Sequence, residues 1–262
     1  MFSPAQIPVS LEMLRSRKLS SESAWILAMA SKLAGDSAET ASDLLSKWGF
    51  ESGEFFVKSR TRGFLAAQGD LVLLAFSLDD EQVRGQEALV VERPHGEVNA
   101  LAYTAFAEVD GIIRSALGIL GAKDKNIWVT GHGLGGAVAI IAAAELDAEF
   151  PVAALHTYNP SCAGKFPFAD WFDATFLGRS YRFEAAGDRI FSVPPGFRQV
   201  QQLVRLDFGE TDEENADAPV VPPKPLDLYI AKLQEQVETE RLKRREPPSD
   251  SRAAERKEAE PD

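Results

Sequence analysis

Residues 129–137 read Val-Thr-Gly-His-Gly-Leu-Gly-Gly-Ala, and this stretch decides the fold. A short apolar run at 127–130 leads into its glycines, and an apolar segment at 134–146 follows them. Apolar runs of these lengths on either side of a glycine cluster predict a buried strand, a tight turn and a helix in direct succession. Because glycine lacks a Cβ, the turn would let the helix approach the strand closely.

The segments on either side of this turn alternate between strand and helix patterns. Continuous apolar runs at 71–76 and 88–91 are typical of strands covered on both faces. Helical spacing of apolar residues predicts helices over 10–34 and 98–119. Further strand candidates are 152–158, 181–185 and 203–208. The alternation predicts an α/β fold with a mostly parallel central sheet flanked by helices.

The composition changes after residue 208, which divides the chain into four expected parts. Residues 1–208 form the α/β domain, and the acidic, proline-rich residues 209–225 form a linker. Residues 226–245 form a C-terminal helix that packs on the domain. Residues 246–262 are charged and contain no large apolar residue, so we expect them to be disordered.

Composition excludes several classes of function. The chain has 262 residues with 28 Lys+Arg against 40 Asp+Glu, a net charge of −12 that disfavours binding to nucleic acid or to an anionic membrane. A single cysteine excludes an internal disulfide framework, and the three histidines lack zinc spacing, so we expect no metal. The glycine turn lacks the Gly-Lys-Ser/Thr of phosphate-binding loops, so we expect no cofactor.

The first residues of the chain and the lengths of its apolar runs indicate where in the cell the protein is expected. The first eight residues contain no basic region followed by an apolar stretch, so we see no signal peptide. The apolar runs are too short for a transmembrane segment. We therefore expect a cytoplasmic protein.

The string Thr-Gly-His-x-Leu-Gly-Gly-Ala at 130–137 resembles the nucleophile elbow of the fungal-type, or class 3, lipase family. Residues 71–76, 155–160, 187–194 and 226–230 resemble further segments of that family, in the same order along the chain. The resemblance implies an α/β-hydrolase fold, a lipid or acyl-ester ligand and a place in lipid or ester metabolism. Within the elbow it gives structural roles to Gly131, His132, Gly135 and Gly136.

The same resemblance locates the catalytic positions, and most of them carry the wrong residue. The nucleophile serine is replaced by Gly133. Asp188 stands at the position of the triad acid, and Lys224 stands where the family has its catalytic histidine. A second family histidine falls near Gln199. An acyl-transfer triad requires a nucleophile and a base within hydrogen-bond reach, and this chain offers neither at the matching positions.

The oxyanion site implied by the resemblance is also altered. One donor, the backbone N–H of Leu134, is retained. The family's second donor, a threonine or serine, is replaced by Asp79, which would place a carboxylate beside developing negative charge. We therefore expect a catalytically inactive, lipase-like protein that keeps a lipid-binding, ester-binding or scaffold role. We also expect Lys224 to form an ion pair with Asp188 in place of the lost histidine pair.

Two other functions stay open. An active acylglycerol lipase or carboxylesterase would require a non-standard nucleophile, for which Ser161 and Cys162 are the candidates. A protein-interaction module would use the C-terminal helix and tail. That module would expose the apolar side of the helix, which consists of Leu226, Ile230, Leu233 and Val237.

Overall fold

A seven-stranded central sheet organises the molecule, and its strand order is β1-β2-β3-β6-β7-β9-β11. The computed structural model describes residues 10–79, 88–185, 193–208 and 225–245. The strands are β1 (Ser52–Lys58), β2 (Thr61–Gln68), β3 (Leu71–Leu78), β6 (Asn126–His132), β7 (Val152–Tyr158), β9 (Ser180–Ala185) and β11 (Gln202–Leu206). The last five run parallel, whereas β1 and β2 join them as antiparallel strands at one edge. The predicted, mostly parallel sheet is confirmed.

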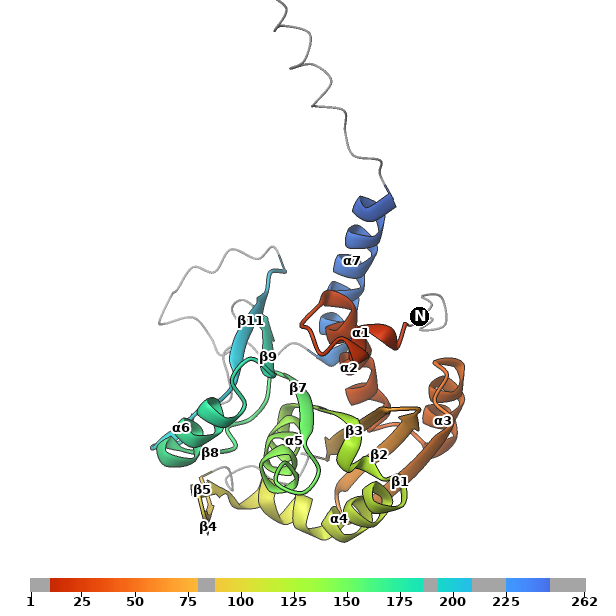
Figure 1. The fold of residues 1–262 in the computed structure, drawn as a ribbon. Helices are drawn as coiled ribbons and strands as arrows, with labels where there is room; N and C mark the ends of the chain where they lie inside the picture. Colours follow the sequence, from red (N-terminus) through yellow and green to blue (C-terminus); the bar gives the residue numbers. More distant parts are fainter. Residues whose placement is uncertain (1–9, 80–87, 186–192, 209–224, 246–262) are drawn as a thin grey trace, which may run out of the picture.

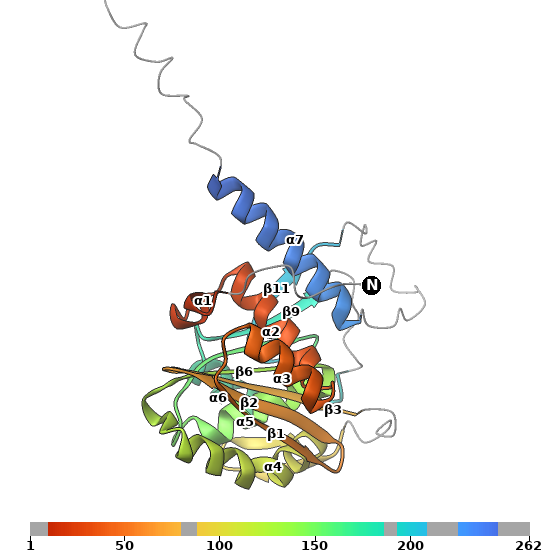
Figure 2. The ribbon, with the colours of Figure 1, turned by 90° about the vertical axis from the view of Figure 1, so that its right-hand side faces the viewer.

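Helices cover both faces of this sheet (Figures 1 and 2). One face carries α1 (Glu12–Arg15), α2 (Ser21–Leu33), α3 (Ala38–Lys47) and α7 (Leu226–Arg245). The other carries α4 (Ala100–Ile119), α5 (Gly133–Leu146) and α6 (Phe166–Thr175). A short 3-10 helix, η2 (Ala122–Asp124), leads from α4 into β6. Among the helices that the structure describes, none combines the length and apolar composition that crossing a membrane requires.

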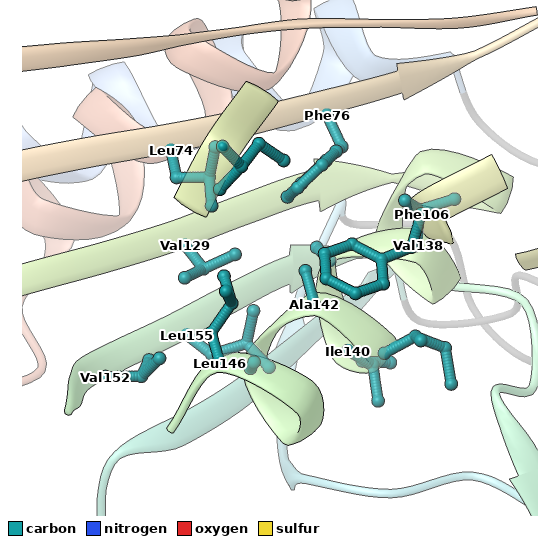
Figure 3. Packing of buried hydrophobic residues seen from close by; sticks show 14 of the residues in the cluster. Leu74, Phe76, Phe106, Val129, Val138, Ile140, Ala142, Leu146, Val152 and Leu155 are labelled. Atoms are coloured by element: carbon teal, nitrogen blue, oxygen red, sulfur yellow. The ribbon is translucent and has the colours of Figure 1, made fainter. Parts of the chain in front are cut away.

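Strand β3 shows why the sheet needs helices on both faces. Leu74 and Phe76 contribute to the core beneath α4 and α5, whereas Leu73 and Ala75 contribute to the core beneath α2. Successive side chains of a strand point to opposite faces, so an uninterrupted apolar run requires two covers. Figure 3 shows the first of these cores, in which β3, β6 and β7 meet α4 and α5. The predicted burial of 71–76 on both faces is confirmed.

A second, smaller sheet lies beside the first and corrects one prediction. Its strands, in the order β10-β8-β5-β4, are β10 (Phe197–Arg198), β8 (Gly164–Lys165), β5 (Gly96–Asn99) and β4 (Val90–Arg93). The apolar run at 88–91 predicts burial on both faces, but Val90 and Val91 are only half-buried and Leu89 is exposed. The expectation is wrong because β4 and β5 pair antiparallel, and an antiparallel sheet can leave one face in solvent.

The N-terminal helix predicted over 10–34 is divided in two. Helix α1 ends at Arg15, and Arg17 adopts a left-handed φ of 54° that no helix can contain. Ser20 then caps α2, because its hydroxyl accepts the Ser23 backbone N–H while the Ser23 hydroxyl accepts that of Ser20. Apolar spacing alone does not show this break.

Helix α7 lies against α2, as both ribbon views show (Figures 1 and 2). Ile230, Leu233 and Val237 are buried in the core on this face, and Leu226 is partly buried against it. The hypothesis of an interaction module requires this apolar side to be exposed, and that expectation is wrong; the tail that the same hypothesis invokes lies outside the described residues. The apolar side of the helix packs on the apolar surface of α2, so the domain itself covers it.

Polar contacts hold both ends of α7. The Ala185 backbone N–H, at the end of β9, donates to the Tyr229 hydroxyl at 2.9 Å. Arg241 forms an ion pair with Glu22 at 2.6 Å. The expected linker over 209–225 and the expected tail over 246–262 lie outside the described residues, apart from Pro225 at the start of the helix.

Candidate functional site

The glycine stretch at 129–137 forms a sharp junction between β6 and α5. His132 has extended backbone angles, and Gly133 turns the chain with a left-handed φ of +56° before the helix begins. Apart from its chain neighbours and the backbone of its own helix, no heavy atom of the described residues lies within 4 Å of the place that a Cβ on Gly133 would occupy. The elbow thus has the strained turn that presents a nucleophile in hydrolases, without a side chain and with space for one among the described residues.

The other glycines of the elbow are required sterically. A Cβ on Gly131 would lie 2.2 Å from the Gly135 carbonyl oxygen, and a Cβ on Gly135 would lie 2.7 Å from the Phe76 carbonyl oxygen. A Cβ on Gly136 would lie 2.9 Å from Cβ of Pro160. These contacts press the first turn of α5 against β3 and β7, as the sequence pattern predicts. Gly133 differs from its neighbours because none of the surrounding described residues excludes a side chain there.

The N-terminus of α5 faces the open side of the elbow without a capping side chain. The His132 side chain donates or accepts no capping hydrogen bond, and the first turn contains no acidic residue. The first backbone N–H groups of a helix have no intrahelical partner, and they carry the positive end of the helix dipole. The N–H of Leu134 is one of them. The resemblance gives this donor the role of the retained half of an oxyanion site, and that role stays a prediction.

Strand β3 presents Ser77, which sequence reasoning overlooked, to the first turn of α5. The Cα of Ser77 would lie 3.0 Å from a Cβ on Gly135. Asp79 lies two residues further along and is exposed, and its backbone N–H donates to the Arg60 carbonyl oxygen at 3.2 Å. β3 continues to Leu78, so Asp79 lies past the end of the strand at the β1–β2 turn. The length of β3 is what places Ser77 beside the elbow.

The chain that follows β7 closes another side of the elbow. The Ser161 backbone N–H donates to the Gly133 carbonyl oxygen at 3.0 Å. The Gln199 Nε2 group donates to the Pro160 carbonyl oxygen at 2.7 Å. Gln199, at the position of a second family histidine, therefore lies near the elbow and presents an amide rather than an imidazole.

Asn159 is a second feature that sequence reasoning missed. It is 1% exposed, has a left-handed φ of 41°, and lies between the end of β7 and Pro160. Neither polar atom of its side chain has a hydrogen-bond partner among the described residues, and the same is true of Gln199 Oε1. Buried polar atoms are usually paired, so these groups beside the elbow have unused capacity for hydrogen bonds. The Asn-Pro pair after a strand was the available signal, because asparagine tolerates a left-handed backbone.

His95, His156 and Cys162 are poorly suited to serve the elbow as a base or as a thiolate nucleophile. His95 lies exposed at the β4–β5 turn, where its ring stacks on Trp171 with centroids 3.7 Å apart. His156 is fully buried among Trp128, Tyr181 and Phe183, and burial lowers its pKa to about 3. His132 is the half-buried residue that precedes the turn.

Cys162 is buried, and burial raises the pKa of its thiol to about 11. The thiol is therefore protonated at neutral pH, which removes the nucleophilic thiolate form. Asp188 and Lys224, the expected acid and base positions, lie outside the described residues. Their predicted ion pair stays a prediction.

A mostly parallel sheet with helices on both faces, and a strained strand–turn–helix elbow at the carboxyl end of its central strand, together define the α/β-hydrolase fold. Residues 68–197, which include the elbow, match the family model described as lipase (class 3). Through this segment, which is just under half of its length, the chain is class 3 lipase-like.

The secreted mono- and diacylglycerol lipase 1 of Fusarium solani is 36% identical over 118 residues. That match covers 42% of this chain and 34% of the relative, so it spans about a third of the curated relative's length. The LIP2 lipase of Yarrowia lipolytica is 19% identical, with a TM-score of 0.59 over 76% of this chain and 81% of that chain. A lipase from Rhizopus microsporus var. chinensis is 17% identical, with a TM-score of 0.55 over 78% and 77%. The two solved structures share the fold.

Proposed function

We propose that this chain is a lipase-like protein that has lost ester hydrolysis and binds an acyl ligand at the former active site. The observation that carries the proposal is Gly133, whose backbone keeps the geometry of a nucleophile elbow while its side chain is absent. Losing the nucleophile alone removes about 10⁶ of the rate in a serine hydrolase. A glycine also relieves the strain of about 1–3 kcal/mol that a left-handed backbone imposes on other residues.

The surroundings of the elbow support loss of catalysis rather than replacement of one group. A substitute nucleophile would need a base within about 3 Å, or one water away. His156 lies among aromatic rings inside the core and His95 lies at a surface turn, so neither serves this role. The sequence pattern places Lys224 at the base position, and an amine that is protonated at neutral pH is a poor base.

The groups that remain favour binding of an acyl carboxylate or ester. The first backbone N–H groups of α5, including that of Leu134, lie beside Gly133 without intrahelical partners, and His132 supplies no capping hydrogen bond. A helix N-terminus of this kind binds carboxylates and other anions. Asn159 and Gln199 add nearby polar atoms that have no hydrogen-bond partner among the described residues. A fatty acid, which combines a carboxylate with an apolar chain, is the simplest ligand of this chemistry.

Two assays on the purified full-length chain test the proposal. Short and long p-nitrophenyl esters should show no turnover above the uncatalysed rate, and a fluorophosphonate probe should form no covalent adduct. Titration with a fluorescent fatty acid should show saturable binding. An adduct or catalytic turnover would overturn the loss of hydrolysis, whereas absence of saturable binding would overturn the binding role.

The second candidate is an esterase that uses Ser161. One observation favours it: the Ser161 backbone lies within hydrogen-bond distance of Gly133, so its side chain starts beside the former nucleophile position. This candidate predicts fluorophosphonate labelling that a Ser161→Ala variant abolishes. Labelling that survives this change would exclude Ser161, and our proposal predicts no labelling of either protein.

The ion pair between Lys224 and Asp188 has its own test. A double-mutant cycle with Lys224→Met and Asp188→Asn, followed by urea unfolding, isolates the pairwise free energy. A buried or half-buried pair gives a coupling of about 1 kcal/mol or more. Additive effects of the two changes would show that the side chains do not interact.

A further inference from the structure

A surface pocket of about 330 Å³ lies at the opposite end of the strands from the elbow. The residues around it lie just before β6, at the start of β7 and just before β9, with Arg17 reaching in from the segment after α1. Four of its side chains are cationic, namely those of Arg17, Lys123, Lys125 and Arg179. Since β6 has seven residues, the elbow at its far end is about 20 Å away. The pocket is therefore separate from the former active site.

The positive charge of this pocket is only partly neutralised. Arg179 forms a bidentate ion pair with Asp147, at 2.8 and 2.9 Å. Arg17, Lys123 and Lys125 form no ion pair with any carboxylate of the described residues, although Asp124 is also part of the lining. Three cations without ion pairs around one concave site are unexpected in a chain with 40 acidic and 28 basic residues. A cleft in which cationic side chains outnumber carboxylates, as the four cations here outnumber Asp124 in the lining, attracts an anion.

Neutral contacts hold several of these cations in place without cancelling their charge. Arg17 donates through Nε to Asn126 Oδ1, and the amide of Asn126 donates in turn to the Asp70 carboxylate at 2.9 Å. The Lys125 ammonium donates to the carbonyl oxygen of Gly69. The Lys123 ammonium lies 6.0 Å from the centre of the Phe150 ring. The remaining N–H groups of the guanidinium and the two ammonium groups can therefore donate to a ligand.

From this geometry we propose that the pocket binds a phosphate group. Arginine and lysine around a concavity are the standard donors for phosphate oxygens, and a phosphate accepts several charge-assisted hydrogen bonds at once. The pocket volume of about 330 Å³ is larger than the volume of one phosphate group. It falls in the range of small-molecule sites, about 300–1,000 Å³. The ligand is therefore a phosphorylated small molecule or the headgroup of a phospholipid. This site is independent of the elbow and of any acyl ligand there.

Pyrophosphate is the probe for the first source of this chemistry. Calorimetric titration of the full-length chain at constant ionic strength should show one site. Saturating pyrophosphate, about 100-fold above Kd, should raise Tm by about 5 °C. The Lys123→Ala/Lys125→Ala double variant should bind at least about tenfold more weakly, because two charge-assisted donors are lost.

A matched control separates a built site from a general charge effect. The Lys47→Ala/Lys58→Ala double variant removes the same charge from exposed lysines on α3 and β1, outside the pocket, and should bind as the native chain does. Equal weakening in both double variants would overturn the proposal.

Vesicles distinguish the two sources of phosphate. Sedimentation with phosphatidylcholine vesicles containing phosphatidic acid, against pure phosphatidylcholine, identifies a headgroup ligand if the Lys123→Ala/Lys125→Ala variant fails to sediment. Binding of pyrophosphate without sedimentation identifies a free phosphorylated molecule. Absence of both pyrophosphate binding and lysine-dependent sedimentation would refute the site.

Discussion

At the scale of single residues, two glycine environments meet within one turn. At Gly131, Gly135 and Gly136, backbone or proline atoms lie within 3 Å of the position that a Cβ would take, so packing explains these glycines. Gly133 has an unusual φ and free space, so only its backbone angle favours glycine. The motif is recognisable from the sequence because it combines glycines required by packing with a glycine favoured by its backbone angle. Only the structure tells these two kinds of glycine apart, because the packing depends on contacts with β3 and β7.

The free space above Gly133 leads to a prediction for Gly133→Ser. The serine should fit sterically, and its left-handed backbone should lower the free energy of unfolding by about 1–2 kcal/mol. Hydrolysis of p-nitrophenyl esters should stay at background, because a hydroxyl without a base is a weak nucleophile. Gly121→Ser is the matched control, since Gly121 has a φ of +59° and equally open surroundings. Similar losses of Tm for the two variants are expected, whereas substantial esterase activity in Gly133→Ser would mean that a base serves the elbow.

His156 makes stability depend on pH. In the unfolded chain its imidazole takes up a proton near its ordinary pKa of 6.5, whereas in the folded protein the pKa is lowered to about 3 by burial. The unfolded state therefore binds more protons between these values, and the free energy of unfolding falls by about 1.4 kcal/mol per pH unit as pH decreases within that window. Above pH 6.5 this contribution is constant.

Replacing His156 tests this dependence. His156→Phe should flatten the decline between pH 6 and pH 4, measured by urea unfolding at each pH, because the aromatic pocket then holds a group that cannot be protonated. His95→Ala should keep the decline, since His156 is still present. A steep decline that persists unchanged in His156→Phe would assign the acid sensitivity to other groups.

At the scale of elements, the predictions that succeeded came from strong apolar patterns. α5 is buried along most of its length, and the sequence predicts its segment to within one residue of Gly133–Leu146. α7 begins where its apolar spacing predicts, at Leu226, and is helical up to Arg245, the last residue described there. β1, β2 and α3 were missed because their apolar runs are short and are flanked by polar, charged or small residues. Their identity depends on pairing within the sheet and on packing in the core, which no local pattern encodes.

The contact of α7 with α2 predicts unequal effects for two leucines of the same helix. Leu233 is 1% exposed and Leu242 is 63% exposed. Leu233→Ala should lower the free energy of unfolding by about 2–5 kcal/mol through loss of buried surface and a residual cavity. Leu242→Ala should change it by less than about 0.5 kcal/mol. Equal, small effects in urea unfolding would mean that α7 is not docked in solution.

At the scale of the whole molecule, one sheet separates two hydrophobic cores. Ile140 of α5 belongs to the core on one face, and Ile26 of α2 belongs to the core on the other.

The α/β-hydrolase architecture could be predicted from the sequence because the glycine turn, the strand order and the family resemblance all agreed. The site was only partly predictable. The elbow and Leu134 could be located, whereas Ser77 and Asn159 reach it through the end of β3 and a left-handed residue after β7.

The separation of the two cores predicts additive effects. Ile140→Val and Ile26→Val should each lower the free energy of unfolding by about 0.5–1.5 kcal/mol. The double variant should equal their sum within about 0.5 kcal/mol, because the two side chains share no partner across the sheet. Urea unfolding of the four proteins provides the cycle. A coupling above about 1 kcal/mol would show that strain passes from one face to the other.

The burial of Cys162 has a practical consequence for studying the former active site. The chain contains a single cysteine, and its raised pKa and inaccessibility protect it from maleimide reagents at neutral pH. A thiol introduced by Gly133→Cys would then be the only readily alkylated sulfur. An environment-sensitive dye attached there would report optically on whatever enters the space above the turn, without any need to remove the native cysteine first.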